Sequence, residues 1–207
     1  MFITFEGTEG SGKTSQLHPT ADFLRQQGRD VLTLREPGGT SIGEQIRKVL
    51  FNLENTEMHP RTEILLFQAS RAQLVEDIIT PHLRKGGVVL CDRYADSTLA
   101  YQGFGYQLDL EPLRALIAFA THALKPDLTL LFDLDVEVGM RRRASGGEWN
   151  RLDAYDLAFY QRVREGYHQL AREEPARWVI INAEQPPGQV QEAVCKAIVK
   201  RLRQKSG

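Results

Sequence analysis

A glycine-rich loop near the amino terminus constrains the fold of this chain more than any other feature. Residues 7–14 read Gly7-Thr8-Glu9-Gly10-Ser11-Gly12-Lys13-Thr14 and match the pattern G-x-x-x-x-G-K-[ST]. In such a loop the backbone N–H groups surround nucleotide phosphates, the lysine contacts the β- and γ-phosphates, and the last hydroxyl binds Mg²⁺. The apolar run 1–5 predicts a strand before the loop, and residues 15–27 predict a helix after it. Strand, loop and helix in this order favour a loop that binds nucleotide phosphates over an ordinary glycine turn.

Apolar runs alternate with helical patterns along the 207 residues, which predicts a single doubly wound α/β domain. Several runs are almost entirely apolar, as expected for parallel strands that helices cover on both faces. Strands are expected at Phe2–Glu6, Val31–Arg35, Gly87–Cys91, Leu128–Asp133 and Trp178–Asn182. Helices are expected at about 13–27, 41–53, 61–85, 109–124, 136–146, 153–174 and 187–204.

Composition excludes several classes of protein. The formal net charge of −1 argues against a broad basic surface for nucleic acid. No apolar run approaches the roughly 20 residues that span a bilayer, and no signal peptide precedes the first strand, so we expect a cytoplasmic protein. Cys91 and Cys195 lack the spacing of a metal site and fit a reducing compartment, with Cys91 expected in the core.

Two further motifs follow predicted strands, where ligands of α/β sheets bind. After the second strand, residues 35–40 read Arg35-Glu36-Pro37-Gly38-Gly39-Thr40 and predict a rigid turn. Its Arg35 either faces a substrate phosphate or lies on the surface. After the third strand, Asp92 could hold Mg²⁺ and Arg93 could clamp a phosphate, the alternative being an ion pair on the surface.

Two other sets of residues allow two interpretations each. Phe67 and Arg71 lie four residues apart on one helix face, where they could stack on a base and bond its edge, or serve as core and solvated charge. The segment at about 141–153 contains several arginines around a Gly-Gly break. These could close as a lid over a transferring phosphoryl group, or form a charged helix end: Arg141, Arg142, Arg143 and Arg151.

Taken together, the motifs resemble the thymidylate kinase family, whose members make dTDP from dTMP. The resemblance covers essentially the whole chain and rests on residues 5–14, residues 35–40, Asp92-Arg93-Tyr94 and Tyr101-Gln102-Gly103. It implies the P-loop nucleoside monophosphate kinase fold, with a central five-stranded parallel sheet and a short lid. It also implies ATP as phosphoryl donor, Mg²⁺ as cofactor and a homodimer. The net charge and the lack of a long apolar run predict no nucleic-acid or membrane partner.

The resemblance assigns a dTMP site to residues that spacing alone leaves open. Glu9 is implied to contact the deoxyribose 3′-OH, and Tyr101 to crowd the sugar 2′ position so that deoxyribose is preferred. Phe67 is implied to stack on thymine. The other implied contacts are polar, from Arg71 and Gln102 to the base and from Arg35 and Arg93 to the phosphate.

The resemblance also implies a catalytic group. Some members carry an arginine inside the phosphate loop where this chain has Gly10, and in members like this one the lid supplies the catalytic arginine instead. Arg151 matches the basic–apolar–acidic end of the family's lid, and Arg143 is chosen from three neighbouring arginines. With Lys13, Asp92 and Arg93 they complete the predicted catalytic set, and Thr14 and Asp92 the Mg²⁺ site, directly or through water. Because the acceptor phosphate is already ionised, Asp92 is expected to position and hold metal rather than accept a proton.

Alternatives remain at this stage. Another kinase of the same architecture could act on UMP, CMP or a deoxynucleoside, and a nucleotide switch or ATPase could share the phosphate loop. A catalytically inactive scaffold is disfavoured by the presence of Lys13, Thr14 and Asp92. For adenine the candidate is the loop at residues 182–185, after the last strand.

Overall fold

A five-stranded parallel sheet forms the centre of the protein in a computed structural model, which describes residues 1–146 and 151–205. The strand order is β2-β3-β1-β4-β5, and neighbouring strands pair in parallel throughout. The predicted sheet is confirmed, with β3 shifted by one residue. The strands are β1 (Phe2–Glu6), β2 (Val31–Arg35), β3 (Val88–Asp92), β4 (Leu128–Asp133) and β5 (Trp178–Asn182).

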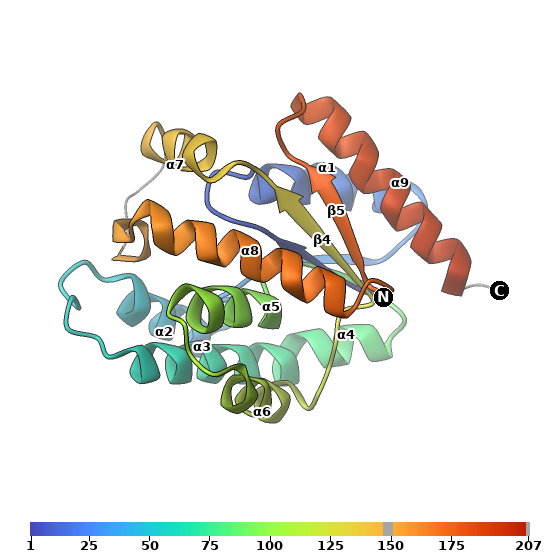
Figure 1. Ribbon diagram of the computed structural model, residues 1–207. Helices are drawn as coiled ribbons and strands as arrows, with labels where there is room; N and C mark the ends of the chain where they lie inside the picture. The colour runs from blue at the N-terminus through green and yellow to red at the C-terminus, as the bar shows by residue number, and fades with distance from the viewer. Residues whose placement is uncertain (147–150, 206–207) are drawn as a thin grey trace.

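Helices cover both faces of this sheet (Figure 1). Helices α1 and α9 pack together on one face, while α3, α5 and α8 lie on the other. The α-helices are α1 (Lys13–Gln26), α2 (Ser41–Phe51), α3 (Pro60–Leu74), α4 (Thr80–Arg84), α5 (Ala95–Thr98), α6 (Leu110–Thr121), α7 (Val136–Ala144), α8 (Leu157–Glu173) and α9 (Pro187–Lys205). Two π-helical segments, η1 (Val75–Ile79) and η2 (Leu99–Gly105), and a 3₁₀ turn, η3 (Arg151–Ala154), complete them.

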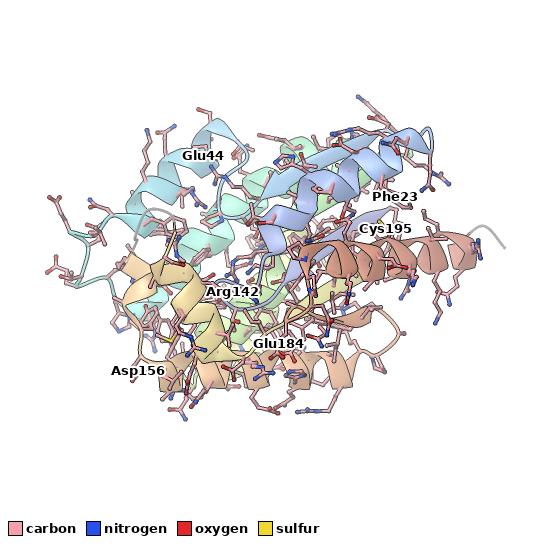
Figure 2. All side chains as sticks on the ribbon, turned by 90° about the horizontal axis from the view of Figure 1, so that it is seen from above. Phe23, Glu44, Arg142, Asp156, Glu184 and Cys195 are labelled. Atoms are coloured by element: carbon pink, nitrogen blue, oxygen red, sulfur yellow. The ribbon has the colours of Figure 1, made fainter. Side chains whose placement is uncertain are left out.

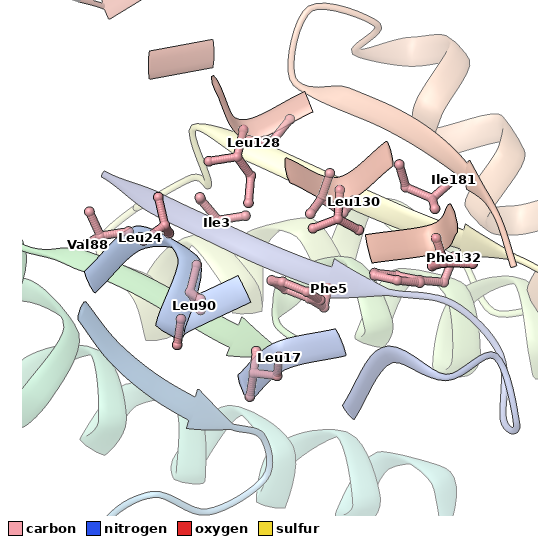
Figure 3. Packing of buried hydrophobic residues seen from close by; sticks show 14 of the residues in the cluster. Ile3, Phe5, Leu17, Leu24, Val88, Leu90, Leu128, Leu130, Phe132 and Ile181 are labelled. Atoms are coloured by element: carbon pink, nitrogen blue, oxygen red, sulfur yellow. The ribbon is translucent and has the colours of Figure 1, made fainter. Parts of the chain in front are cut away.

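Alternating side chains of β1 divide the interior into two layers. Ile3 and Phe5 join the cluster under α1 and α9, where they pack with Leu24 and Phe132 (Figure 3). The alternate residues of β1 point to the opposite layer. The last of these is Glu6, whose side chain is buried against α5 and α8. Cys91 of β3 is fully buried in this second layer, as expected. The carboxylate of Glu6 therefore lies in the protein interior, next to the carboxyl ends of the strands.

The helix predicted at 61–85 is confirmed as one unbroken helical segment, which runs from Pro60 to Arg84 with a π-helical turn inside it. It consists of α3, the wider turn η1 and the short α4. Pro81, in the first turn of α4, has no N–H to donate, and a proline ring clashes with the carbonyl four residues earlier in a regular helix. The π-helical turn just before it relieves that clash.

Residues 95–105 form α5 and η2, although no helix was predicted there. This segment packs against α8 at very close range: a Cβ at Gly105 would lie 2.5 Å from the Phe159 ring. Tertiary packing therefore overrides a glycine-containing sequence of low helix propensity. Helix α8 itself begins at Leu157 rather than at 153, because the Asp156 side chain accepts a hydrogen bond from the Phe159 N–H (2.7 Å).

Candidate active site

A cavity of about 470 Å³ lies beyond the carboxyl ends of β1, β2 and β3. The phosphate loop and side chains from α2, α3, η2 and α7 line it. Motifs that are far apart in the sequence therefore meet at one sheet edge, as expected for this fold. The lining includes these residues of the predicted dTMP site: Glu9, Arg35, Phe67, Arg71, Tyr101 and Gln102.

The phosphate loop holds Lys13 within its own curve. Lys13 Nζ donates to the carbonyl oxygens of Gly7 (2.9 Å) and Thr8 (2.8 Å) and to Ser11 Oγ (3.3 Å). Helix α1 begins at Lys13, and no side chain caps its first N–H groups. Uncapped N–H groups at the positive end of a helix, together with an ammonium group, attract an anion. The loop is therefore built to receive phosphate.

Gly10 is required by the packing of the loop against α7. Its φ is 69°, and a Cβ there would lie 2.1 Å from the Gly139 carbonyl oxygen. No side chain fits this contact without displacing α7. The arginine that some family members carry at this place is thus excluded here by geometry as well as by sequence.

Thr14 and Asp92, the predicted Mg²⁺ ligands, lie next to each other on the cavity wall. Thr14 Oγ1 donates to Asp92 Oδ2 at 2.5 Å. Asp92 is the last residue of β3, and both of its neighbouring strands end beside it. A hydroxyl and a carboxylate are the oxygen donors that Mg²⁺ prefers, with substrate phosphates and water completing its coordination. The pair fits Mg²⁺ held jointly with a nucleotide, and the described residues form no cluster of three or more His, Cys, Asp or Glu ligands.

Glu9, Arg93 and Tyr101 form a tight polar group in the same cavity. Arg93 Nη2 donates to Glu9 Oε2 (2.5 Å) and to the Tyr101 hydroxyl (3.0 Å), which itself donates to Glu9 Oε1 (3.2 Å). Burial opposes ionisation of Glu9, but the charges of Arg93 and Lys13 hold its pKa below the usual value. An ionised carboxylate beside a guanidinium can accept a hydroxyl hydrogen bond and leaves the guanidinium oriented for an anion.

Arg71 of α3 is almost completely buried at the wall of the cavity. Its guanidinium donates to Glu36 Oε2 (2.7 Å), Gln68 Oε1 (2.9 Å), Thr98 Oγ1 (3.0 Å) and the Tyr94 carbonyl (3.1 Å). Sequence reasoning placed Glu36 only in a turn and missed that it anchors Arg71. The orientation of Arg71 toward the cavity is thus fixed before any substrate binds.

Gln102 connects the cavity to a second network outside it. Its Nε2 donates to Glu63 Oε1 at 2.8 Å, and Glu63 is fully buried. The Tyr106 hydroxyl donates to the same carboxylate (2.9 Å). Arg151 Nη2 donates to its other oxygen, and Arg151 Nε to the Leu50 carbonyl (3.0 Å). Arg151, the predicted lid arginine, therefore lies off the cavity lining and joins η3 to α2 and α3.

Other arginines stand on the cavity itself. Arg142 and Arg143 of α7 line it, whereas Arg141 is exposed and pairs with Glu137 on the same helix. Arg142 Nη1 donates to the Ala183 carbonyl (3.2 Å), so that it lies beside the candidate adenine loop, marked by Glu184 in Figure 2. The rest of the predicted lid, residues 147–150, lies outside the described residues.

Two further arginines that line the cavity, Arg35 and Arg47, are held by neighbouring groups. Arg35 pairs with Glu44 (2.9 Å) and donates to the Pro37 carbonyl. Arg47 of α2, which sequence reasoning missed, also lines the cavity and donates to Pro37, and its guanidinium lies 4.2 Å from the Phe51 ring centre. Burial and the nearby charge of Arg35 lower the pKa of Arg47 to about 10. This end of the cavity is therefore rich in positive charge.

Comparisons with known proteins identify the family to which the chain belongs. The sequence model of the family described as "Thymidylate kinase" matches residues 5–194. The chain belongs to the thymidylate kinase family. The thymidylate kinase of Thermomicrobium roseum is 50% identical to it over 203 residues, or 98% of this chain and 96% of the relative. That of an Exiguobacterium species is 46% identical over 204 residues, or 99% of this chain and 96% of the relative.

A solved thymidylate kinase structure has the same fold. The crystal structure of the Ehrlichia chaffeensis thymidylate kinase matches with a TM-score of 0.79 and 34% sequence identity, covering 96% of this chain and 98% of that one. The P-loop nucleoside monophosphate kinase fold and the family predicted from the motifs are both confirmed. Within the described residues no helix is long and apolar enough to cross a membrane.

Proposed function

We propose that the cavity transfers the γ-phosphoryl group of ATP to dTMP, giving dTDP and ADP. The observation that carries this proposal is the meeting of the phosphate loop with the Glu9–Arg93–Tyr101 group and with Phe67 and Arg71 in one cavity. A nucleotide switch or a plain ATPase needs the loop but not a second, base-recognising half. The family membership of the chain supports the same reaction.

Charge repulsion between two polyanionic substrates is the main obstacle to this reaction. Lys13 and the N–H groups at the start of α1 would hold the phosphates of ATP, while Arg93 would hold the acceptor phosphate of dTMP. Arg142 and Arg143 reach the same cavity from α7 and would add positive charge at the donor side. The phosphate of dTMP is already ionised at neutral pH, so Asp92 has no proton to remove and serves to position.

Mg²⁺ fits the oxygen pair of Thr14 and Asp92, and when bound with ATP it would neutralise phosphate charge. The chain's own contribution is to keep that pair in place. Asp92 is anchored in the backbone ladder by the Glu36 N–H, which donates to its carbonyl at 3.0 Å.

Selectivity for dTMP would come from fixed groups around the sugar and base. Tyr101 is nearly buried, and its hydroxyl is held by Glu9 and Arg93, so it cannot turn away from a ribose 2′-OH. Arg71 and Gln102 are likewise held by buried carboxylates, Glu36 and Glu63. A rigid polar site rejects a substrate that leaves its groups unpaired.

A panel of acceptors tests the proposal. ADP release from ATP·Mg²⁺ is measured with dTMP, dUMP, UMP, CMP, AMP or GMP, and without acceptor. We expect strong release with dTMP, weaker release with dUMP and little with the others. Equal release without acceptor would instead mean an ATPase, and a preference for UMP or CMP would mean a different nucleoside monophosphate kinase.

The homodimer implied by the family also belongs to this proposal. Helices α3 and α6 pack side by side at one edge of the molecule (Figure 1). They expose large apolar side chains, with Leu65 of α3 at 55% and Phe119 of α6 at 85%. Exposed apolar side chains of this size are typical of association surfaces and support a contact between two copies of the chain.

A further inference from the structure

Arg93, the proposed phosphate clamp, is fixed on two sides. On the cavity side Nη2 donates to Glu9 and Tyr101. On the inner side Nη1 donates to Ser97 Oγ (3.2 Å) and to the Tyr167 hydroxyl (3.3 Å). The inner pair comes from α5 and from α8, a helix more than 70 residues away in the sequence. The position of Arg93 therefore depends on two neutral hydroxyl groups, which accept its hydrogen bonds only when their own hydrogens point elsewhere.

A buried carboxylate lies directly behind those two hydroxyls. Glu6 Oε2 accepts hydrogen bonds from Ser97 Oγ (2.6 Å) and from the Tyr167 hydroxyl (3.0 Å). Glu6 Oε1 accepts the Tyr94 backbone N–H (2.8 Å). Glu6 and Tyr167 have no exposed surface, and Ser97 is buried at 9% exposure. Hydrogen bonds therefore connect Glu6 to Arg93 through the two hydroxyls. The reaction scheme proposed above assigns no role to Glu6.

We propose that Glu6 is a positioning residue, whose carboxylate orients the Ser97 and Tyr167 hydroxyls so that both accept from Arg93 and hold it on the dTMP phosphate. Each hydroxyl has only one hydrogen to donate. The two hydroxyl oxygens also lie 2.9 Å apart, so one could donate to the other. An ionised Glu6 is the stronger acceptor and draws both hydrogens to its carboxylate, which leaves lone pairs of both oxygens for the guanidinium. This inference rests on the proposed function, since it concerns the acceptor side of that reaction.

A glutamine at this position would reverse the direction of the hydrogen bonds to Ser97 and Tyr167. The Tyr94 N–H fixes the amide oxygen at the Oε1 position, so the NH₂ group falls where Oε2 now lies. There it would donate to Ser97 and Tyr167 instead of accepting from them. At least one hydroxyl hydrogen would then point at Arg93, donor against donor, although shape and volume are almost unchanged. Glu6→Gln therefore tests the direction of these hydrogen bonds while leaving the packing almost unchanged.

Burial and the groups around Glu6 act on its ionisation in opposite directions. Burial, followed by the nearby charge of Asp96 on α5, raises the pKa of Glu6 to about 7. Hydrogen bonds from Ser97 and Tyr167 and the charge of Arg93 oppose this rise. Lys13 adds a further positive charge in range. At pH 8 the ionised form prevails, and activity is best compared there.

The test uses steady-state kinetics at pH 8 on the full chain and its Glu6→Gln and Tyr167→Phe variants. We expect kcat/KM for dTMP to fall at least about tenfold in Glu6→Gln and by a smaller factor in Tyr167→Phe. KM for ATP should stay within about twofold of wild type, because the phosphate loop is untouched. A matched control is Tyr94→Phe, which removes an equally buried hydroxyl that donates to the Leu124 carbonyl, away from Arg93.

Two outcomes would overturn the inference. One is a folded Glu6→Gln variant whose kcat/KM for dTMP equals that of wild type. The other is a parallel loss for dTMP and ATP that Tyr94→Phe reproduces, which would mean a purely structural role. Thermal unfolding of each variant checks the fold, and if Glu6→Gln does not fold, Tyr167→Phe decides by the same split between dTMP and ATP. Failure of the proposed function would appear separately, as wild-type enzyme without dTMP-dependent ADP release.

Discussion

At the scale of single residues, Glu6 is fully buried and forms no direct ion pair with any residue that the structure describes. Its carboxylate is held by one backbone N–H and two hydroxyls, and its pKa is raised to about 7, first by burial and then by Asp96. In the unfolded chain the same carboxyl has an ordinary pKa near 4.5. Between these two values the native protein holds a proton that the unfolded chain has released. Proton binding therefore favours the native state, and stability should rise as the pH falls through 7.

This sign can be measured by comparison with Glu6→Gln, which cannot titrate. We expect the free energy of unfolding of wild type, relative to the variant, to increase as the pH is lowered from 8.5 to 5.5. The slope is at most about 1.4 kcal/mol per pH unit. Urea unfolding of both proteins at four pH values provides the data, and titrating groups remote from Glu6 cancel because they behave alike in both proteins. Parallel stability curves would show that Glu6 keeps its ordinary pKa in the native protein.

At the scale of elements, the turn η3 is tied to helix α3 by Arg151 and Glu63. The ion pair is almost completely buried, and the same carboxylate also accepts from Gln102 of η2. Two roles for Arg151 follow: an anchor, as the contacts indicate, and the lid arginine that the family resemblance implies. The two roles differ in what the loss of Glu63 should do.

Comparing Arg151→Ala with Glu63→Gln separates these roles. We expect Arg151→Ala to lower kcat by at least about tenfold more than Glu63→Gln does, with a smaller effect on dTMP binding, because an arginine that reaches the phosphoryl group acts mainly in the transition state. Both values come from initial rates at saturating ATP and dTMP, with dTMP binding measured by calorimetry. Equal losses in the two variants would remove Arg151 from the catalytic set and leave it as an anchor.

The sequence predicts the elements that depend on local patterns, but not the contacts between residues far apart in the chain. The phosphate loop, the five strands and the strand-end motifs follow from local patterns, since a glycine turn or an apolar run needs no distant partner. The anchors do not: Arg71 pairs with Glu36, 35 residues away, and Tyr167 with Glu6, 161 residues away. Nor does α5–η2, whose helical form depends on packing against α8. Residues were thus assignable to the site, but not the contacts that hold them.

At the scale of the whole molecule, α3 and α6 carry the exposed apolar side chains on which the proposed dimer rests. Phe119 is 85% exposed, whereas the other aromatic side chains among the described residues are buried or half-buried. Leu65 adds apolar surface on the adjacent helix. The nucleotide cavity opens at the strand ends and is lined without Leu65 or Phe119, so association there would leave it accessible.

Replacing Phe119 by glutamate tests association through this surface. A buried, unpaired carboxylate at the centre of an apolar contact costs several kcal/mol, enough to dissociate a dimer of micromolar affinity. We expect wild type to sediment at twice the mass of the chain and Phe119→Glu at the mass of one chain. Ile180→Glu is the matched control, since Ile180 is also an exposed apolar residue, at 51%, but lies on the edge strand β5. A wild-type monomer, or a Phe119→Glu dimer, would exclude α6 as the contact, whereas a monomer produced only by Phe119→Glu would assign the dimer to this surface.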